Sequence, residues 1–271
     1  MLQKFYQENK RGSLPWRKTK DIYKILLSEV MLQQTQVSRV LVKYKEFLTK
    51  FPDVQTLAPS PLRDVLTLWQ GLGYNRRAKF LHEASKKIGD AKPTELKDYQ
   101  FLCSLPGVGQ STAGAVFAFT QNKPIVFIET NIRAVILHHF FADITEEKVP
   151  DIKIKEILEK LIAMLPKDFG PRDFYYAMYD YGTHLKQTLG TQRKALHQKS
   201  KSYVKQSKFQ GSRRQLRAFI LKTFLEMESK KNFKKVLTEK VLKTKPKILN
   251  QYKKEDIILL IDELEKEGML Y

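Results

Sequence analysis

Apolar residues recur every three or four positions through most of the first 189 residues, which is the spacing of helices with one buried face. The longest such run covers residues 21–51, where Asp21 is placed to cap its start and a polar break near Gln34 to Gln36 divides it. A short capped helix is predicted from residue 60 to Gly71 or Gly73, and others at 75–88, 95–105, 125–141, 153–165 and 171–185. No sustained strand alternation precedes residue 190, so the pattern predicts an all-α domain.

The chain changes character after residue 189. Residues 190–213 are polar and basic with few branched apolar side chains, which predicts a linker or a DNA-facing basic arm. Amphipathic helices return at 213–227 and within 253–271, with 234–244 between them. The ending EKEGMLY fits a short strand after a helix, as in a winged-helix-like unit, and a three-helix unit fits equally well. We therefore predict three parts, at 1–189 (two helical lobes), 190–212 and 213–271.

Charge narrows the classes of partner. The 271 residues carry a formal net charge of +20, which favours a polyanion such as nucleic acid or, less favourably, an anionic membrane surface. No run approaches the ~18 apolar residues of a membrane span, and MLQKFYQENKRG lacks the apolar core of a secretion signal. The single cysteine, Cys103, is expected in the core and cannot form a disulfide framework. A cytoplasmic, nucleoid-associated monomer without a membrane partner is expected.

The segment LPGVGQSTAGAVFAF, residues 105–119, places two glycines in front of a helix-like run of small residues. Glycines allow a tight turn and a close approach of the backbone to a ligand. Ser111 and Thr112 are predicted to cap the helix that follows. The exposed backbone N–H groups at a helix start favour an anion such as a phosphate. A plain turn between two helices is the alternative.

Five segments together resemble the MutY-type adenine DNA glycosylases of the helix-hairpin-helix superfamily, which includes endonuclease III. They are LPWR (14–17), LLSEVMLQQTQV (26–37), LWQGLGYNRRAKFLH (68–82), LPGVGQSTAGAV (105–116) and ETNIRAV (129–135). The resemblance covers roughly residues 5–188 and implies a helix-hairpin-helix glycosylase fold. It also implies that residues 105–116 form the hairpin that grips a DNA phosphate, through Gly107, Val108, Gly109, Ser111 and Thr112. A monovalent cation often occupies this hairpin in the family.

Glu29 is the first candidate catalytic residue. It lies in the apolar stretch LLSEVML, and an apolar wall raises the pKa of a carboxyl so that it can act as a general acid. Excision of a purine needs such an acid, because the base departs more easily once it is protonated on N7. The resemblance identifies Glu29 with the catalytic glutamate of the family. A surface glutamate on an amphipathic helix is the alternative.

Glu129 is the second candidate and departs from the family, which carries an aspartate here. In the family that carboxylate stabilises the sugar cation and helps to deliver the water. A longer arm displaces the carboxylate, and an error on the order of 1 Å can cost ~100-fold in rate. The site is therefore rebuilt around the longer arm or its activity differs, unless Glu129 serves only as a charge at a helix N-terminus. Asn131 matches a residue near the reacting sugar that orients the carboxylate or a water.

Ser111 bears on the type of reaction. Relatives that also cut the strand carry a lysine here that forms a Schiff base with the sugar, and a serine cannot do so. The sequence thus predicts base excision with little or no lyase activity.

The resemblance also assigns residues around the flipped base. Gln34 and Tyr74 match the residues that wedge into the base stack and fill the space that flipping vacates. The second tyrosine usual in the family is Asn75 here. Trp16, Arg17 and Asp180 match the surroundings of the base. Arg17 is expected to hold Glu29 or the base, and Asp180 to face the exocyclic amine or, alternatively, to be a plain surface aspartate.

Two features of the family are missing from this sequence. The region GTHLKQTLGTQRKALHQKSKSY has no cysteine where relatives bind a [4Fe–4S] cluster, so no cluster and no other metal cofactor is expected. His184 and His197 stand alone there and are expected to be solvated. The roughly 60 residues after the basic arm are too few for the domain that reads 8-oxoguanine in adenine glycosylases.

The sequence favours a monofunctional DNA N-glycosylase that acts on double-stranded DNA with a mispaired or damaged base, most simply adenine or another purine. Excision of uracil or thymine opposite guanine is one alternative. A DNA-binding damage sensor without catalysis is the other, and the change at residue 129 is its best support.

Overall fold

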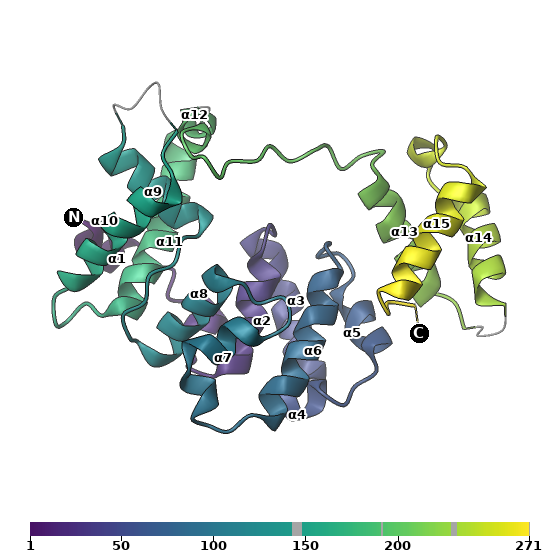
Figure 1. Cartoon of the computed structure of the whole chain (residues 1–271), viewed down its shortest axis with the longest axis horizontal. Coiled ribbons are helices and arrows are strands. Elements are labelled where there is room, and N and C mark those ends of the chain that lie inside the picture. The colour runs from purple at the N-terminus through teal and green to yellow at the C-terminus, as the bar shows by residue number, and fades with distance from the viewer. Residues whose placement is uncertain (143–147, 191, 229–231, 271) are drawn as a thin grey trace. The chain divides into compact units, whose positions relative to one another are not determined.

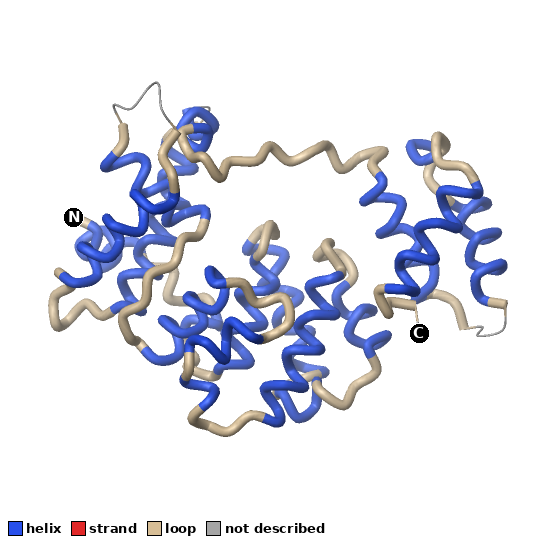
Figure 2. The backbone as a smooth tube through the Cα atoms, in the orientation of Figure 1, coloured by secondary structure: helices blue, strands red, loops and turns tan. Residues whose placement is uncertain are grey.

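The structure, a computed structural model, describes residues 1–142, 148–190, 192–228 and 232–270, and this part of the chain is built from helices joined by loops (Figures 1 and 2). Within these ranges the only β-type pairing is an isolated parallel bridge between Val149 and Ser200. The predicted all-α class is confirmed. None of the helices in the described ranges combines the length and the apolar character needed to cross a bilayer.

Two compact units are interleaved along the sequence. The first comprises Met1–Val30 and Asp90–Lys205, and the second comprises Met31–Gly89 and Gln206–Tyr271. The last two residues of helix α2 (Ile22–Leu32) therefore belong to the second unit, and the rest of the helix belongs to the first. The boundaries at 189/190 and 212/213 predicted from the sequence differ from this grouping, and they stay a prediction.

The first unit is organised around α11 (Pro171–Thr188), which packs against α1, α8 and α9. Its other elements are α1 (Leu2–Asn9), the 3₁₀ turns η1 (Pro15–Arg17) and η2 (Glu95–Lys97), α7 (Tyr99–Ser104), α8 (Gln110–Gln121), α9 (Thr130–Phe140), α10 (Asp151–Ala163) and α12 (Gln192–Gln198). The contact between α9 and α11 requires a glycine, because a Cβ atom at Gly182 would stand 2.5 Å from the Cβ of Asn131. This close approach fixes the start of α9 beside the middle of α11.

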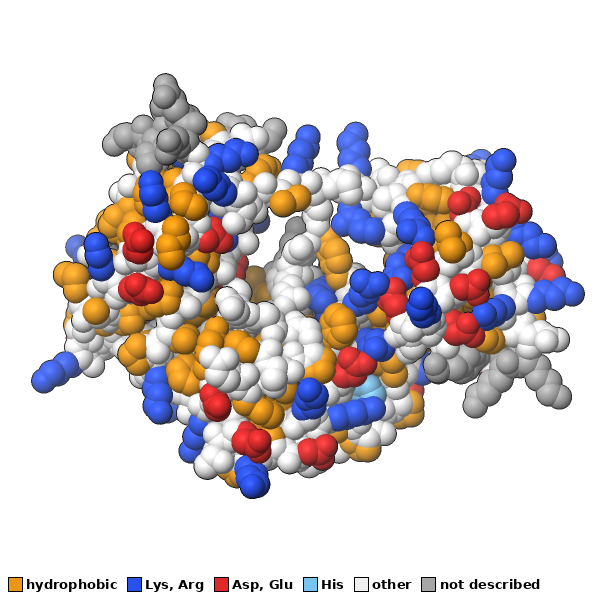
Figure 3. Space-filling model, viewed as in Figure 1, with side chains coloured by type: hydrophobic (Ala, Val, Ile, Leu, Met, Phe, Trp, Pro, Cys, Tyr) orange, Lys and Arg blue, Asp and Glu red, His pale blue; other side chains and the backbone are white. Residues whose placement is uncertain are grey.

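The second unit contains two groups of helices. The first group is α3 (Val37–Lys50), α4 (Val54–Leu57), α5 (Leu62–Trp69) and α6 (Arg76–Asp90), and the second is α13 (Arg213–Leu225), α14 (Phe233–Thr244), η3 (Lys247–Leu249) and α15 (Lys254–Lys266). Trp69 and Phe47 are fully buried in the first group and meet edge to face at 6.2 Å. On the face seen in Figure 3, the C-terminal helices carry acidic and basic side chains side by side, in accord with ion pairs such as Lys234–Asp262.

Local details test the sequence predictions. Asp21 accepts a hydrogen bond from the Lys24 N–H at 2.8 Å, as a cap should, and α2 and α3 are separated at the predicted polar break. The C-terminal part is a three-helix unit. The strand of the winged-helix alternative is absent from residues 267–270, where the chain turns at Gly268 with φ +67°. The basic region 190–213 also differs from a plain linker, since it contains α12.

Cys103 was expected in the core, but the structure leaves it only half-buried on the short helix α7. Tyr99, one turn earlier on the same helix, carries a hydroxyl that hydrogen-bonds to this thiol. The apolar neighbours in the sequence belong to the buried face of α7, and Cys103 lies at the border of that face.

Candidate active site and DNA-contacting loops

Glu29 lies in the most apolar helix of the first unit. On α2, Leu27 and Ser28 before it and Val30 after it are buried, so the backbone carries the Glu29 carboxyl into the interior with only part of the side chain accessible. Burial, and then the negative charge of Glu129, raises the pKa of Glu29 to about 8. The carboxyl is therefore protonated at neutral pH and can donate a proton.

Tyr179 on α11 is the direct partner of this carboxyl. Its hydroxyl donates to Glu29 Oε2 at 3.4 Å. Burial and then the charges of Glu29 and Glu129 raise the pKa of Tyr179 well above its usual value, so the phenol stays protonated and remains a donor. Donation to the carboxylate lowers the pKa of Glu29 slightly against the effect of burial.

Glu129 is the N-cap of α9. Its Oε2 accepts the Asn131 backbone N–H at 2.8 Å and its Oε1 accepts from Asn131 Nδ2 at 3.2 Å. Burial raises the pKa of Glu129, and the N–H donors at the helix start counteract that rise. The two carboxyl groups thus have different environments: Glu29 has one weak donor, whereas Glu129 has several. Unlike environments of this kind push the pKa values of two carboxyl groups apart, and here the donors counteract the rise at Glu129 more than at Glu29.

The sequence offered two roles for Glu129, a helix-terminal charge or a catalytic carboxylate. In the structure the carboxylate that caps α9 is also the one beside Glu29. The structure brings Glu29, Glu129 and Asn131 together, as the sequence predicted. Tyr179, which the sequence did not predict, lies in the same cluster. The longer side chain of glutamate reaches both donors of Asn131, so the helix start is built to fit it.

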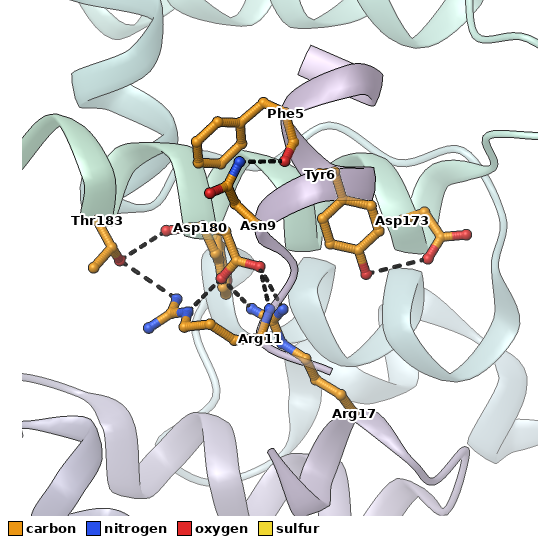
Figure 4. A network of polar contacts seen from close by, with 9 residues as sticks. Phe5, Tyr6, Asn9, Arg11, Arg17, Asp173, Asp180 and Thr183 are labelled. Carbon is orange, nitrogen blue, oxygen red and sulfur yellow. Dashed lines mark hydrogen bonds and ion pairs between the residues drawn. The ribbon is translucent and has the colours of Figure 1, made fainter. Parts of the chain in front are cut away.

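Asp180 and Arg17 pair with each other (Figure 4). The Arg17 guanidinium donates to both oxygens of Asp180, at 2.7 and 2.8 Å, and Arg11 adds its Nε at 2.5 Å and its backbone N–H at 3.1 Å. Burial alone would raise the pKa of Asp180, but the two guanidinium groups outweigh it and lower the pKa. The alternative of a surface aspartate is wrong, since Asp180 is buried.

These contacts bear on two sequence expectations. Arg17 was expected to hold Glu29 or the base, but the hydrogen bonds of its guanidinium go to Asp180, while its charge still lowers the pKa of Glu29. Asp180 was expected to face the exocyclic amine of a base, and that role stays a prediction; in the structure its carboxylate accepts from two guanidinium groups. Trp16, on the 3₁₀ turn η1, is 3% exposed, so its ring belongs to the core of the first unit.

Gln34 and Tyr74 lie in two segments of the second unit, residues 31–35 (the end of α2 and the turn after it) and 71–74, called here the wedge loops. Both residues adopt a left-handed backbone, with φ of 55° and 49°, and Gly71 and Gly73 beside Tyr74 have φ of 91° and 73°. Non-glycine residues rarely adopt this conformation, and where they do the strain often marks a functional position. Tyr74 is 42% exposed and Gln34 is also exposed.

A buried arginine on α6 fixes both wedge loops. The Arg77 guanidinium donates to the carbonyls of Met31 and Gln33 at 3.0 and 2.7 Å, and to those of Leu72 and Gly73 at 3.0 and 2.9 Å. Burial lowers the pKa of Arg77 to about 10, which still leaves it charged at neutral pH. One side chain therefore sets the positions of Gln34 and Tyr74 together.

The predicted hairpin is present between α7 and α8. Gly107 has φ of +70°, the Val108 side chain is buried, and the Val108 N–H bonds to the Leu105 carbonyl at 3.1 Å. Gly109 is the N-cap of α8, so no side chain caps the start of this helix.

The predicted caps at Ser111 and Thr112 are wrong, because α8 begins one residue earlier, at Gln110. Both residues lie in its first turn. The first-turn backbone N–H groups of α8 therefore have no N-cap side chain before them.

The residues present do not fit an iron–sulfur cluster. Such a cluster needs four thiolates, and the chain has only Cys103, on α7. The described ranges also contain no group of three or more His, Cys, Asp or Glu side chains placed to hold a metal ion. His184 is exposed on α11 and its ring lies 5.3 Å from that of Phe5.

Sequence reasoning missed three residues that organise this site: Tyr179, Arg77 and Arg11. Tyr179 stands in the aromatic run YYAMYDY, where nothing in the pattern separates it from core tyrosines. Arg77 is buried while its neighbour Arg76 is exposed, and the pair RR does not reveal which one points inward. The signal that could have found Arg77 was helical phase, because it shares a face with the buried Leu81 and Ala84.

The hairpin between α7 and α8 in the first unit is the feature that defines a helix-hairpin-helix protein. The comparison with protein families agrees. Residues 27–164 match the model of the HhH-GPD superfamily of base excision DNA repair proteins, and the chain belongs to this family.

Curated relatives are similar over two thirds of this chain. The adenine DNA glycosylase of Buchnera aphidicola subsp. Schizaphis graminum (strain Sg) is 36% identical over 188 residues, covering 67% of this chain and 52% of the relative. The adenine DNA glycosylase of Mycobacterium tuberculosis (strain ATCC 25618 / H37Rv) is 35% identical over 182 residues, covering 66% and 58%. The chain spans about half the length of the curated relatives that it matches first.

Solved structures share the fold. A thermostable thymine-DNA glycosylase superposes with a TM-score of 0.55 at 24% identity, covering 67% of this chain and 82% of that one. Endonuclease III in a non-covalent DNA complex gives 0.51 at 18% identity, covering 66% and 81%. At this level of identity the likeness concerns the fold alone.

Proposed function

We propose that the chain is a monofunctional DNA glycosylase that removes adenine from double-stranded DNA. The observation that carries the proposal is the pair of unlike carboxyl groups, Glu29 with its pKa raised to about 8 and Glu129 held by the N–H donors of α9. An acid that keeps its proton at neutral pH is what excision of a purine requires. The similarity to adenine DNA glycosylases supports adenine as the base.

Glu29 acts as the general acid. Its proton passes to a ring nitrogen of the adenine, so that the base leaves as a neutral molecule while the glycosidic bond breaks. The sugar then carries an oxocarbenium-like charge. Glu129, the anion of the pair, stabilises this charge and accepts the proton of the water that adds to the sugar carbon. Asn131 keeps the Glu129 carboxylate in place through its two hydrogen bonds.

The product is an abasic site in an intact strand. Strand cleavage by a lyase route needs an amine that forms a Schiff base with the sugar, and position 111 is a serine in the first turn of α8. We therefore expect little strand cleavage until alkali is added.

Contact with DNA is proposed to involve three features. The first-turn N–H groups of α8 bind a backbone phosphate without reading sequence. Gln34 and Tyr74 fill the space left by the flipped base. The net charge of +20 adds a salt-dependent, sequence-independent affinity. We propose that the chain binds DNA as a monomer, on the chromosome in the cytoplasm.

The experiment is base release from duplex oligonucleotides that carry adenine opposite guanine, cytosine or 8-oxoguanine. Further duplexes carry hypoxanthine, uracil or thymine in place of the adenine. Cleavage of the labelled strand is read with and without alkali. Adenine release seen only after alkali supports the proposal. Release of a pyrimidine alone would favour a different glycosylase, and binding without any release would favour a damage sensor.

A matched pair of variants assigns the acid. Glu29→Gln should abolish release while DNA affinity stays within a few-fold, because the amide keeps the shape and cannot donate the acidic proton. Glu159→Gln removes an exposed glutamate of α10 and should leave the rate unchanged. Equal loss of binding and release in Glu29→Gln would contradict the acid role.

A further inference from the structure

The start of the C-terminal part contacts both wedge residues. Gln206 Nε2 donates to the side-chain oxygen of Gln34 and to the hydroxyl of Tyr74, so a single amide bridges them. Arg214 Nη1 donates to the same Tyr74 hydroxyl at 2.9 Å, while its Nη2 donates to the Ser207 carbonyl at 2.8 Å. All of these residues belong to the second unit.

These contacts come from outside the residues that match the family model, which end at 164. We propose that Gln206 and Arg214 are positioning residues of the wedge, and that residues 206–214 bind duplex DNA beside it. The inference rests on the proposed function, since it assumes that Gln34 and Tyr74 enter the base stack.

The C-terminal helices are fastened to the helices that carry the wedge. Arg63 on α5 donates to the carbonyls of Phe224 and Leu225 at the end of α13, at 3.3 and 2.8 Å. Arg76 on α6 donates from Nε to Glu267 at 2.9 Å, and Arg217 on α13 donates to the same carboxylate. Two separate points of attachment therefore hold Arg214, near the start of α13, against Tyr74.

Two guanidinium groups lie close to the ring of Tyr74. The guanidinium carbons of Arg77 and Arg214 lie 5.7 and 5.9 Å from the centre of the Tyr74 ring. Arg77 is buried and donates to four carbonyls of the wedge loops. Arg214 is half-exposed, so it can donate to DNA while it supports the tyrosine.

Residues 206–214 could either bind DNA together with the wedge or cover the wedge until DNA displaces them. The charge of this segment favours DNA binding. Residues 201–217 contain six Lys or Arg and no Asp or Glu. Such a segment is attracted to the same polyanion as the wedge. Tyr74 and Gln34 also keep exposed surface while these hydrogen bonds are made.

The experiment uses the full chain and a duplex with a stable abasic-site analogue opposite 2-aminopurine. Insertion of the wedge unstacks this base and raises its fluorescence, and no chemistry is needed. Arg214→Ala and Gln206→Ala should each lower the fluorescence amplitude and weaken binding by about tenfold, as expected for loss of a hydrogen bond to the wedge. Lys208→Ala, which removes an exposed charge of the same segment, should lower the affinity and its salt dependence while it leaves the fluorescence amplitude at saturation unchanged.

Two further variants separate position from charge. Arg214→Lys keeps the charge but cannot hold Tyr74 and Ser207 at once, so it should match Arg214→Ala in fluorescence and the wild type in salt dependence. Tyr74→Phe removes the shared hydroxyl, and adding Arg214→Ala to it should cost much less than in the wild type. Equal effects of Arg214→Ala and Lys208→Ala, or additive losses with Tyr74→Phe, would overturn the inference.

Stronger binding or a larger fluorescence change in Arg214→Ala would show that the segment covers the wedge, and would also overturn the inference. The proposed function is judged separately. A fluorescence response of the wild type without base release from any duplex would contradict the glycosylase and leave the wedge support standing. Base release with no wild-type fluorescence response would overturn the wedge support alone.

Discussion

The hydroxyl of Tyr179 on α11 lies 3.4 Å from Oε2 of Glu29 on α2, in the first unit. Burial of Glu29 and its hydrogen bond with Tyr179 have opposite effects on the pKa of the Glu29 carboxyl. Burial keeps the proton on Glu29, whereas the phenol stabilises the carboxylate that remains when the proton has left. The pair therefore lets Glu29 hold a proton at neutral pH and still release it to a base.

Replacing Tyr179 by Phe should shift the pH dependence of excision. Loss of the hydrogen bond raises the pKa of Glu29 beyond about 8, so the alkaline fall of the single-turnover rate moves to higher pH. The rate at neutral pH should drop by at most about tenfold, the effect of one hydrogen bond. Tyr181→Phe is the control, because that hydroxyl contacts His139 instead. An alkaline limb that does not move in Tyr179→Phe would contradict the assignment.

Glu29→Gln should stabilise the fold while it removes the activity. Between pH 4.5 and about 8 the unfolded chain releases the proton of Glu29 and the folded chain keeps it, so the stability of the wild type falls as pH rises through this window. The variant lacks this slope. Its advantage should grow from about pH 5 and level off above pH 8, at roughly 2–4 kcal/mol after allowance for partial exposure.

Urea unfolding at pH 5, 6, 7 and 8 measures this difference. Glu159→Gln, at an exposed position, provides the control and should show no pH-dependent difference from the wild type. A constant difference for Glu29→Gln across these pH values would mean that Glu29 ionises in the folded chain as it does in water.

Glu129→Asp tests whether the site is built for the longer side chain. Aspartate can still cap α9, so stability should change little. Its carboxylate would retreat by about 1 Å from the position fixed by the two Asn131 donors, and excision should slow by about 100-fold. Single-turnover base release measures the effect. Faster release by Glu129→Asp would mean that the site is still shaped for the shorter residue.

Much of the fold was predictable because it depends on local patterns. Helical spacing and the polar break at 34–36 place α2 and α3 correctly, and the glycines of LPGVG mark the hairpin. The contacts within the site depend on long-range pairs. Arg17 meets Asp180 163 residues later, and Gln206 meets Gln34 172 residues earlier. Neither partner carries a sequence signal for the other.

The buried ion pairs of Asp180 should matter more for stability than for proton transfer. Asp180→Asn leaves the charges of Arg17 and Arg11 without a counterion, which should cost about 3–5 kcal/mol in the free energy of unfolding at pH 7. Asp64→Asn removes the partner of Lys50 at the surface and should cost less than about 1 kcal/mol. Urea unfolding compares the two variants.

The pH dependence gives an independent check on Asp180. The pKa of Asp180 is lowered in the folded chain, so its contribution is present above the usual value of 3.8 and is lost as pH falls through the lower folded value. The deficit of Asp180→Asn should therefore shrink as the pH falls below 4. A deficit that stays constant into that range would point to lost packing instead of lost charge.

The phosphate-binding role of the hairpin can be separated from its role in the fold at Gly109. This residue has φ of −80° and ψ of 171°, and an added Cβ atom would meet nothing within 4 Å, so Gly109→Ser should fold normally. The serine hydroxyl can cap α8, which keeps or slightly raises stability. It would also occupy the first-turn N–H groups that a phosphate needs, and DNA affinity should fall by about tenfold. Thermal unfolding and DNA titration together measure both effects, with Gly89→Ser on α6 as the control. Unchanged DNA affinity in Gly109→Ser would show that the hairpin is only a turn between α7 and α8.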